Sequence, residues 1–264
     1  MTGLSFDRHC AEIVAQSDLL RAHLDRADLT VAVPSCPGWN LGQLVRHLGG
    51  GQRWAAEVVR TRATVPPTDT HFRDLSAYAR EEAAVVGPWL VESAAELAGA
   101  LNAAGPEVMT WTPLPVPAAT VFWARRFAHE TLMHRADAAL ALGEDLAVDP
   151  AVAVDALDEW MELGSLPMMF DIYPERRTLL GPGRTLHLHA TDLPAEAGAE
   201  WLVDLTGDTL AWRRAHEKAA VAVRGPVTEL LLLVYRRRPV GEAAVEVLGD
   251  AALLDLWLDR VQFG

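Results

Sequence analysis

Cysteine is scarce in this sequence. Its 264 residues contain two, Cys10 and Cys36, and neither belongs to a CxxC pair. Two isolated cysteines do not form a disulfide framework, and they fit the reducing environment of the cytosol. A nucleophilic role for Cys36 has no support from a cationic neighbour in the sequence, so a small buried residue is the favoured interpretation.

Positive charge is also in short supply. The chain has 23 lysines and arginines against 36 aspartates and glutamates, which gives a formal net charge of −13. Proteins that bind nucleic acid without regard to sequence need basic residues to replace phosphate counterions, so this class is excluded. The only basic run, residues 236–238, is too short to change that conclusion.

Long apolar runs and a leader are missing as well. No window approaches the roughly 18 uninterrupted apolar residues of a membrane span. The N-terminus has no basic region followed by an apolar stretch. We therefore expect a soluble cytoplasmic protein with neither nucleic acid nor a membrane as partner. The sequence does not determine an oligomeric state.

Half of all residues are hydrophobic, and the first 145 or so show the spacing of apolar residues that is typical of helices. Helices are predicted at residues 5–25, 41–60, 74–103 and 119–142. Asn40 is a predicted N-cap and Gly143 a predicted C-cap, while Gly87-Pro88 marks a kink or break in the third helix. Four helices in about 145 residues predict a four-helix bundle over residues 1–148.

The pattern changes after Pro150. A helix at residues 151–163 is followed by strand-like "RTLHLHAT", "EWLVDLTGD", "AAVAVRG" and "AAVEVLGD", and by helical "PVTELLLLVYRR" and "AALLDLWLDRVQ". Helices and strands mix only in this part of the chain. The predicted fold class is thus a helical bundle followed by a smaller C-terminal α/β domain, residues 149–264, with a mainly antiparallel sheet.

The stretch "AHETLMHRAD" contains H-E-x-x-x-H, which has one residue more than the metalloprotease signature H-E-x-x-H. On a regular helix His129 and His134 lie about 140° apart, so they cannot bind one metal together. Glu130 and His134, four residues apart, share the face expected to point into the bundle. Two interpretations of this pair remain open: an ion pair, or two ligands of a divalent metal. His129 is expected on the flank of the helix or behind the ligands.

A third ligand is available on the second helix. His47 lies on the flank of its apolar stripe and precedes three glycines, each of which costs a helix roughly 1 kcal/mol relative to alanine. Gly51 is expected to leave space beside the imidazole. His47, Glu130 and His134 would supply three ligands and leave a fourth position open, as catalytic metals require. Asp137 is either a hydrogen-bond acceptor behind these ligands or a surface partner of an arginine.

His187 and His189 share one face of a predicted strand and form an H-x-H pair. Without a third ligand nearby in the sequence, an exposed or interdomain face is favoured over a metal site for this pair.

Two longer stretches carry a family resemblance. "VPSCPGWNLGQLVRHLGGGQRW" and "RRFAHETLMHRADAALALG" resemble the actinobacterial mycothiol-dependent maleylpyruvate isomerase family, and the C-terminal segments "RTLHLHATD" and "VEVLGDAALLDLWL" are similar to its second domain. The resemblance implies a DinB-like metal-binding bundle and a C-terminal domain similar to sterol-carrier folds. It also implies Zn²⁺ or another divalent ion on His47, Glu130 and His134.

The resemblance further implies a catalytic arginine before a proline at the end of the penultimate helix. Arg237, within "RRRP", is the best match, although arginine stands where the family usually has glycine. The other interpretation of this run is a group of solvated arginines at a helix C-terminus.

The implied activity is isomerisation with mycothiol as cosubstrate. A mycothiol thiolate adds to an electron-poor double bond, the resulting single bond rotates, and elimination returns the thiol and the trans product. Arg237 would hold a substrate carboxylate. Two alternatives stay open: a mycothiol S-transferase that keeps the thioether adduct, and a non-catalytic metal-binding or ligand-carrying protein.

Overall fold

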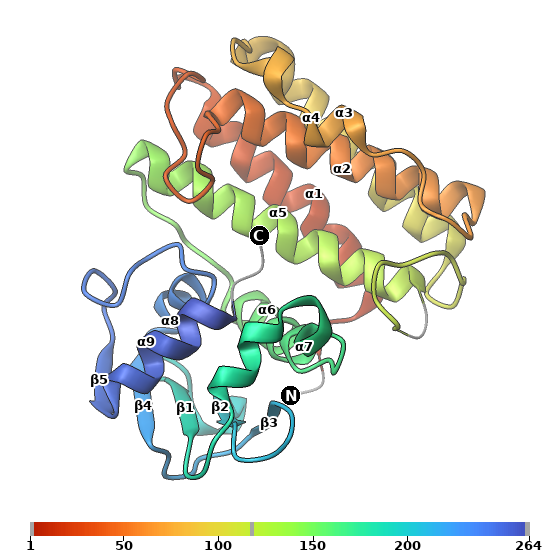
Figure 1. Cartoon of the computed structure of the whole chain (residues 1–264). Coiled ribbons are helices and arrows are strands. Elements are labelled where there is room, and N and C mark those ends of the chain that lie inside the picture. The colour runs from red at the N-terminus through yellow and green to blue at the C-terminus, as the bar shows by residue number, and fades with distance from the viewer. Residues whose placement is uncertain (1–2, 117–118, 262–264) are drawn as a thin grey trace. The chain divides into compact units, whose positions relative to one another are not determined.

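The computed structural model describes residues 3–116 and 119–261 of the chain (Figure 1). These residues form two compact units. One spans Leu4–Leu146, and the other contains the chain from Ala147 onward together with Gly3. The predicted boundary between residues 148 and 149 lies two residues from this division.

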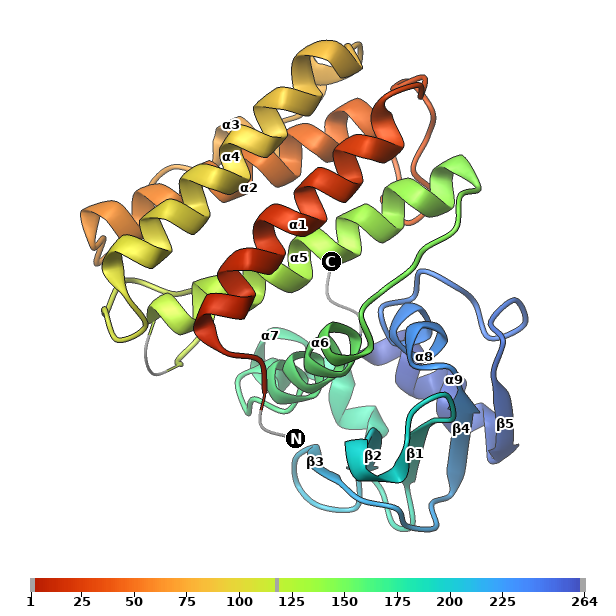
Figure 2. The same cartoon turned by 180° about the vertical axis from the view of Figure 1, so that it is seen from behind.

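The N-terminal unit is built from long helices, as predicted. They are α1 (Phe6–Leu24), α2 (Leu41–Thr61), α4 (Ala83–Ala104) and α5 (Ala119–Leu142), joined by the short α3 (Thr70–Arg73) and the 3₁₀ turn η1 (Ser76–Tyr78). Helix α1 packs against α4 and α5, and α2 packs against the same two helices, so α2 and α5 are neighbours in the bundle (Figures 1 and 2).

The predicted helix ends are confirmed at two positions. The side chain of Asn40 accepts a hydrogen bond from the backbone nitrogen of Gln43, whose own side chain accepts one from the backbone of Asn40, both at 3.0 Å. This reciprocal capping box satisfies two amides at the start of α2. At the end of α5, Gly143 has φ +67°, the left-handed conformation that ends this helix.

The predicted start of the third helix is wrong. The chain at residues 74–82 forms turns, and α4 begins at Ala83, because Asp74 accepts hydrogen bonds from the backbone and the hydroxyl of Ser76 at 3.2 and 2.7 Å. A local side-chain acceptor of this kind competes with helix formation. Gly87-Pro88 does not end the helix. Pro88 lies in the second turn of α4, where the helix loses one backbone hydrogen bond because proline has no N–H group.

Helix α4 is also long and apolar enough to cross a membrane by length and composition alone. In the structure Leu90, Leu97 and Leu101 are fully buried, and the helix packs on α1 and α2. These leucines therefore belong to the bundle core, as the apolar stripe of a core helix does.

The C-terminal unit contains a sheet of five strands among the described residues, in the order β3-β2-β1-β4-β5. The strands are β1 (Thr185–Ala190), β2 (Glu200–Asp204), β3 (Ala211–Arg214), β4 (Val221–Gly225) and β5 (Glu246–Gly249). Every pair is antiparallel except β1 with β4, which confirms the predicted mainly antiparallel sheet. Strand β3 was not predicted, since "AWRR" has no buried apolar alternation.

Helices cover one face of this sheet. They are α6 (Pro150–Gly164), α8 (Val227–Val234) and α9 (Ala251–Arg260), accompanied by the shorter α7 (Met169–Ile172), η2 (Pro174–Leu179) and η3 (Ala195–Ala197). Helix α8 packs on β1 and β4, α9 packs on β4, and α6 packs on α8. Leu186 and Leu188 on β1 are fully buried, so the alternation of this strand sends its leucines into the core and its histidines to the opposite face.

Candidate metal centre

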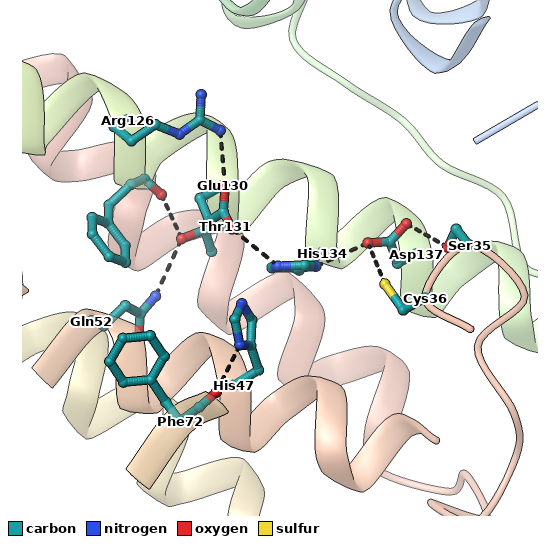
Figure 3. Close-up of polar contacts among 11 residues, drawn as sticks. Ser35, Cys36, His47, Gln52, Phe72, Arg126, Glu130, Thr131, His134 and Asp137 are labelled. Carbon is teal, nitrogen blue, oxygen red and sulfur yellow. Dashed lines mark hydrogen bonds and ion pairs between the residues drawn. The ribbon is translucent and has the colours of Figure 1, made fainter. Parts of the chain in front are cut away.

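The three residues predicted as metal ligands come together between α2 and α5. Helix α5 presents Glu130 and His134 one turn apart, and α2 presents His47 opposite them (Figure 3). One ligand atom from each residue can be chosen so that all three lie within 4.8 Å of one another. His129 is not part of this group: it is fully buried, and its ring packs edge-on against His9 at 5.9 Å.

Hydrogen bonds on the far side of each ring leave the Nε2 atoms of both histidines available. Nδ1 of His47 lies 2.9 Å from the carbonyl oxygen of Phe72, and Nδ1 of His134 lies 2.9 Å from Oδ2 of Asp137. Because both partners accept, Nδ1 carries the proton of the neutral ring, and Nε2 has the lone pair that binds a metal.

The Nε2 atom of His134 supports the same assignment. It is buried and 3.2 Å from Oε1 of Glu130, yet no described residue meets it in hydrogen-bond geometry. Two imidazole nitrogens and a carboxylate oxygen are a donor set that suits Zn²⁺ and similar divalent ions. The residues present therefore fit a metal at this position.

The charges around the site favour a cation between the carboxylates. Burial disfavours the charged form of His134, but contacts with Asp137, Cys36 and Glu130 raise its pKa well above the usual value. Burial likewise opposes ionisation of Glu130, whereas contacts with His134 and Arg126 hold the pKa of this carboxyl well below its usual value. Burial and the neighbouring His134 lower the pKa of His47. A divalent ion would thus compete with the proton of His134 for this position.

Glu130 is also where the site meets solvent. Its Oε2 atom accepts a hydrogen bond from Arg126 at 3.0 Å, and 35% of its side chain is exposed. His134 is buried. Solvent therefore reaches Glu130 more readily than His134.

The loop before α2 supports His134 from behind. Asp137 is fully buried, and its Oδ1 accepts a hydrogen bond from the hydroxyl of Ser35 at 2.6 Å, while the thiol of Cys36 donates to Oδ2 at 3.6 Å (Figure 3). Of the two roles considered for Asp137, the structure selects the hydrogen-bond acceptor, which lies behind His134. Cys36 is half-buried and contacts the same carboxylate, a partner that its place in the sequence did not indicate.

The three glycines of α2 have a different role from the one expected. A Cβ atom on Gly49 would collide with the ring of Trp89, one on Gly50 would lie 2.5 Å from Cβ of Phe72, and one on Gly51 would only touch the ring of Phe127 at 3.5 Å. Aromatic side chains thus fill the space that was expected to stay open beside His47. Gly50 in particular lets Phe72 approach α2 and place its carbonyl against His47.

Arg237 lies in the C-terminal unit, after α8. Its guanidinium donates to the carbonyl of Tyr235 at 2.9 Å. The arginines beside it form ion pairs, Arg236 with Asp259 at 3.3 Å and Arg238 with Glu229. These are contacts within the protein, and they do not test the catalytic role of Arg237, which stays a prediction.

Comparison with known proteins bears on both units. The model of the mycothiol maleylpyruvate isomerase N-terminal domain matches residues 10–139, and that of the MDMPI C-terminal domain matches residues 151–256. No curated protein matches the chain. A crystal structure of the mycothiol-dependent maleylpyruvate isomerase is similar with a TM-score of 0.60 at 14% identity, covering 94% of this chain and 95% of that one.

A second solved structure, a histidine-to-alanine variant of the mycothiol-dependent maleylpyruvate isomerase, also has a TM-score of 0.60, at 13% identity, and covers 93% of this chain and 96% of that one. At such identities the likeness shows the fold, and the two family models cover most of the sequence. The chain therefore belongs to the mycothiol maleylpyruvate isomerase family.

Proposed function

We propose that this protein is a divalent-metal-dependent, mycothiol-using isomerase of the cytoplasm, with Zn²⁺ as the favoured ion on His47, Glu130 and His134. One observation carries the proposal: the ligand atoms of these residues converge within 4.8 Å, and each imidazole is fixed from behind at Nδ1. A site made only for an ion pair would not need two rings held in the same tautomer.

The bound ion would supply one piece of chemistry, since a thiol that coordinates a divalent metal gives up its proton near neutral pH. The chain's own residues supply the rest. Asp137 and the carbonyl of Phe72 fix the directions of the ligand rings. Trp39, whose ring centre lies 4.7 Å from that of His47, forms an apolar wall beside the ligands, which shields a thiolate from water.

The reaction that fits is cis to trans isomerisation of an activated double bond. The thiolate of mycothiol adds to one alkene carbon, and the electron pair moves toward the neighbouring carbonyl group. The bond between the two carbons is then single and rotates. Expulsion of the thiolate restores the double bond in the trans form, so the thiol is regenerated and nothing is oxidised or reduced. Arg237 is the proposed partner of a substrate carboxylate.

Maleylpyruvate is the first substrate to test, because the isomerases of known structure that resemble this chain act with mycothiol and carry that name. Purified protein should contain a divalent ion and convert maleylpyruvate only when mycothiol is present. Glu130→Gln should lose metal and activity together, whereas His23→Ala, which removes a histidine paired with Glu144 elsewhere in the bundle, should keep both.

Three results would count against this proposal. Turnover that is indifferent to mycothiol contradicts the thiol mechanism. Full metal content in both His47→Ala and Glu130→Gln contradicts the site. Consumption of one mycothiol per substrate, with a thioether as the final product, identifies an S-transferase instead of an isomerase.

A further inference from the structure

The open face of the C-terminal sheet carries a second cluster of histidines. His187 and His189 point to the same side of β1, away from Leu186 and Leu188. In the antiparallel register with β2, His189 lies opposite Glu200, and residues directly opposite each other share a face. The strand pairing therefore places one carboxylate beside two imidazoles.

The third imidazole of the cluster belongs to His216, which follows β3 in the chain. The backbone nitrogen of Ala215 donates to the carbonyl oxygen of Glu200 at 3.3 Å, which extends the pairing of β2 and β3 beyond the end of β3. Arg213 and Glu217, which lie on either side of His216 in the chain, form an exposed ion pair at 2.7 Å. His216 is thereby directed at the carboxylate of Glu200.

The polar atoms of these residues converge on one oxygen. Oε2 of Glu200 lies 2.8 Å from Nε2 of His187, 2.7 Å from Nδ1 of His216 and 3.8 Å from Nδ1 of His189. The ring centre of His216 is 5.7 Å from that of His187 and 5.8 Å from that of His189, with the ring planes nearly perpendicular. His187, Glu200 and His216 can place three ligand atoms within 4.8 Å of one another.

His187 is the member of the cluster that an ion pair explains least well. Its side chain is 8% exposed, and its buried Nε2 atom has no partner in hydrogen-bond geometry among the described residues. An imidazole nitrogen that has no hydrogen-bond partner can offer its lone pair to a metal. Neutral imidazole is the form that binds metals.

We propose that His187, Glu200 and His216 form a second site for a divalent transition metal, with His189 at hand as a further ligand. Two imidazoles and a carboxylate suit Zn²⁺, and also Ni²⁺, Cu²⁺ and Co²⁺, but not Mg²⁺ or Ca²⁺, which prefer oxygen donors alone. The side chain of His216 is 75% exposed, which leaves the ion an entry path from solvent.

This second site differs from the bundle site in what it joins. Its ligands come from β1, from β2 and from the segment between β3 and β4. An ion there would cross-link three segments of one sheet and fasten the segment that follows β3, and it requires neither mycothiol nor the bundle ligands. The inference therefore stands or falls separately from the proposed isomerase activity.

Metal counting on the full-length protein tests the site. Chelator-treated protein is titrated with Zn²⁺ by calorimetry, and bound metal is counted after dialysis. His216→Ala and Glu200→Gln should each bind one equivalent fewer than the unchanged protein, while His47→Ala loses the equivalent of the bundle site. His23→Ala, which also removes a histidine paired with a glutamate, should bind as many equivalents as the unchanged protein.

A spectroscopic readout accompanies the count. Co²⁺ added to His47→Ala protein should produce visible absorption from low-symmetry coordination by nitrogen and oxygen, and this absorption should vanish in the His47→Ala/His216→Ala double variant. Zn²⁺ should also raise the melting temperature of the His47→Ala protein and not that of the double variant, because only a folded site binds the ion.

Unchanged metal binding in the variants would contradict the second site. His216 is exposed, so its replacement by alanine should not disturb folding, which circular dichroism verifies. If His216→Ala and Glu200→Gln both bind as many equivalents as the unchanged protein with the same affinity, the cluster is an ion-pair network without a metal, and the inference is overturned.

Discussion

Nδ1 of His134 lies 2.9 Å from Oδ2 of Asp137, and that carboxylate is fully buried. The contact fixes both the orientation of the imidazole and its tautomer, so that Nε2 faces Glu130. It also connects the proposed metal position to the loop before α2, because Ser35 and Cys36 hold the same carboxylate.

Asp137→Asn tests this support. We expect about a 10- to 100-fold loss of Zn²⁺ affinity, because the amide has lost the charge that orients the ring and strengthens its lone pair. Zn²⁺ titration in competition with a chromophoric chelator measures the loss. Asp145→Asn, at an exposed position just beyond α5, is the matched control and should bind as the unchanged protein does. Equal affinities in the two variants would remove Asp137 from the site.

Gly50→Ala tests whether the close packing of Phe72 on α2 positions the carbonyl that contacts His47. The new methyl group would lie 2.5 Å from Cβ of Phe72, so α3 must shift and carry its carbonyl away from His47. We expect weaker Zn²⁺ binding and a fall in the free energy of unfolding of about 1–3 kcal/mol. Denaturant unfolding and metal titration report the two effects.

The matched control for this substitution is Gly99→Ala in α4, where a Cβ atom meets nothing within 4 Å. Alanine there should raise the free energy of unfolding by about 0.5–1 kcal/mol and leave metal binding unchanged. Destabilisation by Gly50→Ala without any change in metal affinity would show that Phe72 does not position His47.

Arg237→Lys tests the proposed carboxylate contact in catalysis. A charge-assisted hydrogen bond is worth about 1.5–3 kcal/mol, so we expect kcat/KM for maleylpyruvate to fall by about 10- to 100-fold. Lysine cannot reproduce the planar, bidentate contact of arginine. Arg238→Lys, which keeps the charge that pairs with Glu229, is the control and should retain activity. Equal loss in both variants would point to the helix end and not to the substrate.

The two cysteines should differ in reactivity. Burial, together with the nearby charge of Asp7, raises the pKa of Cys10 from 9.0 to about 11, and its side chain is 1% exposed. A disulfide reagent at pH 8 should therefore modify the half-buried Cys36 in the native protein and reach Cys10 only after unfolding. Rapid labelling of the native Cys36→Ser variant would contradict this order.

The same pKa has a consequence for stability. Because the folded thiol ionises at a higher pH than the unfolded one, the contribution of Cys10 is fully present below pH 9 and is lost as pH rises from 9 to about 11. Cys10→Ala should lack this part of the pH dependence when unfolding free energies are compared across that window. An identical alkaline loss in the variant would assign the effect to other groups.

Much of the fold and part of the site could be predicted because they depend on local patterns. Periodicity located α1, α2 and α5, the Asn40 cap started α2, and Gly143 ended α5. Spacing alone placed Glu130 and His134 on one face and set His129 aside, since a regular helix fixes those directions. The start of α4 was missed, because the Asp74 side chain favours a turn in a stretch that otherwise suits a helix.

The sequence by itself determined which residues can share a helix face or a strand face, as with Glu130 and His134 or His187 and His189. The sequence also proposed His47 as a partner of the first pair, but only the tertiary structure decided which other groups meet these residues: the carbonyl of Phe72 in the bundle, and His216 beside Glu200 on the sheet. The physical reason is that helix and strand geometry fixes directions over a few residues, while contacts across long stretches of chain depend on how whole elements pack.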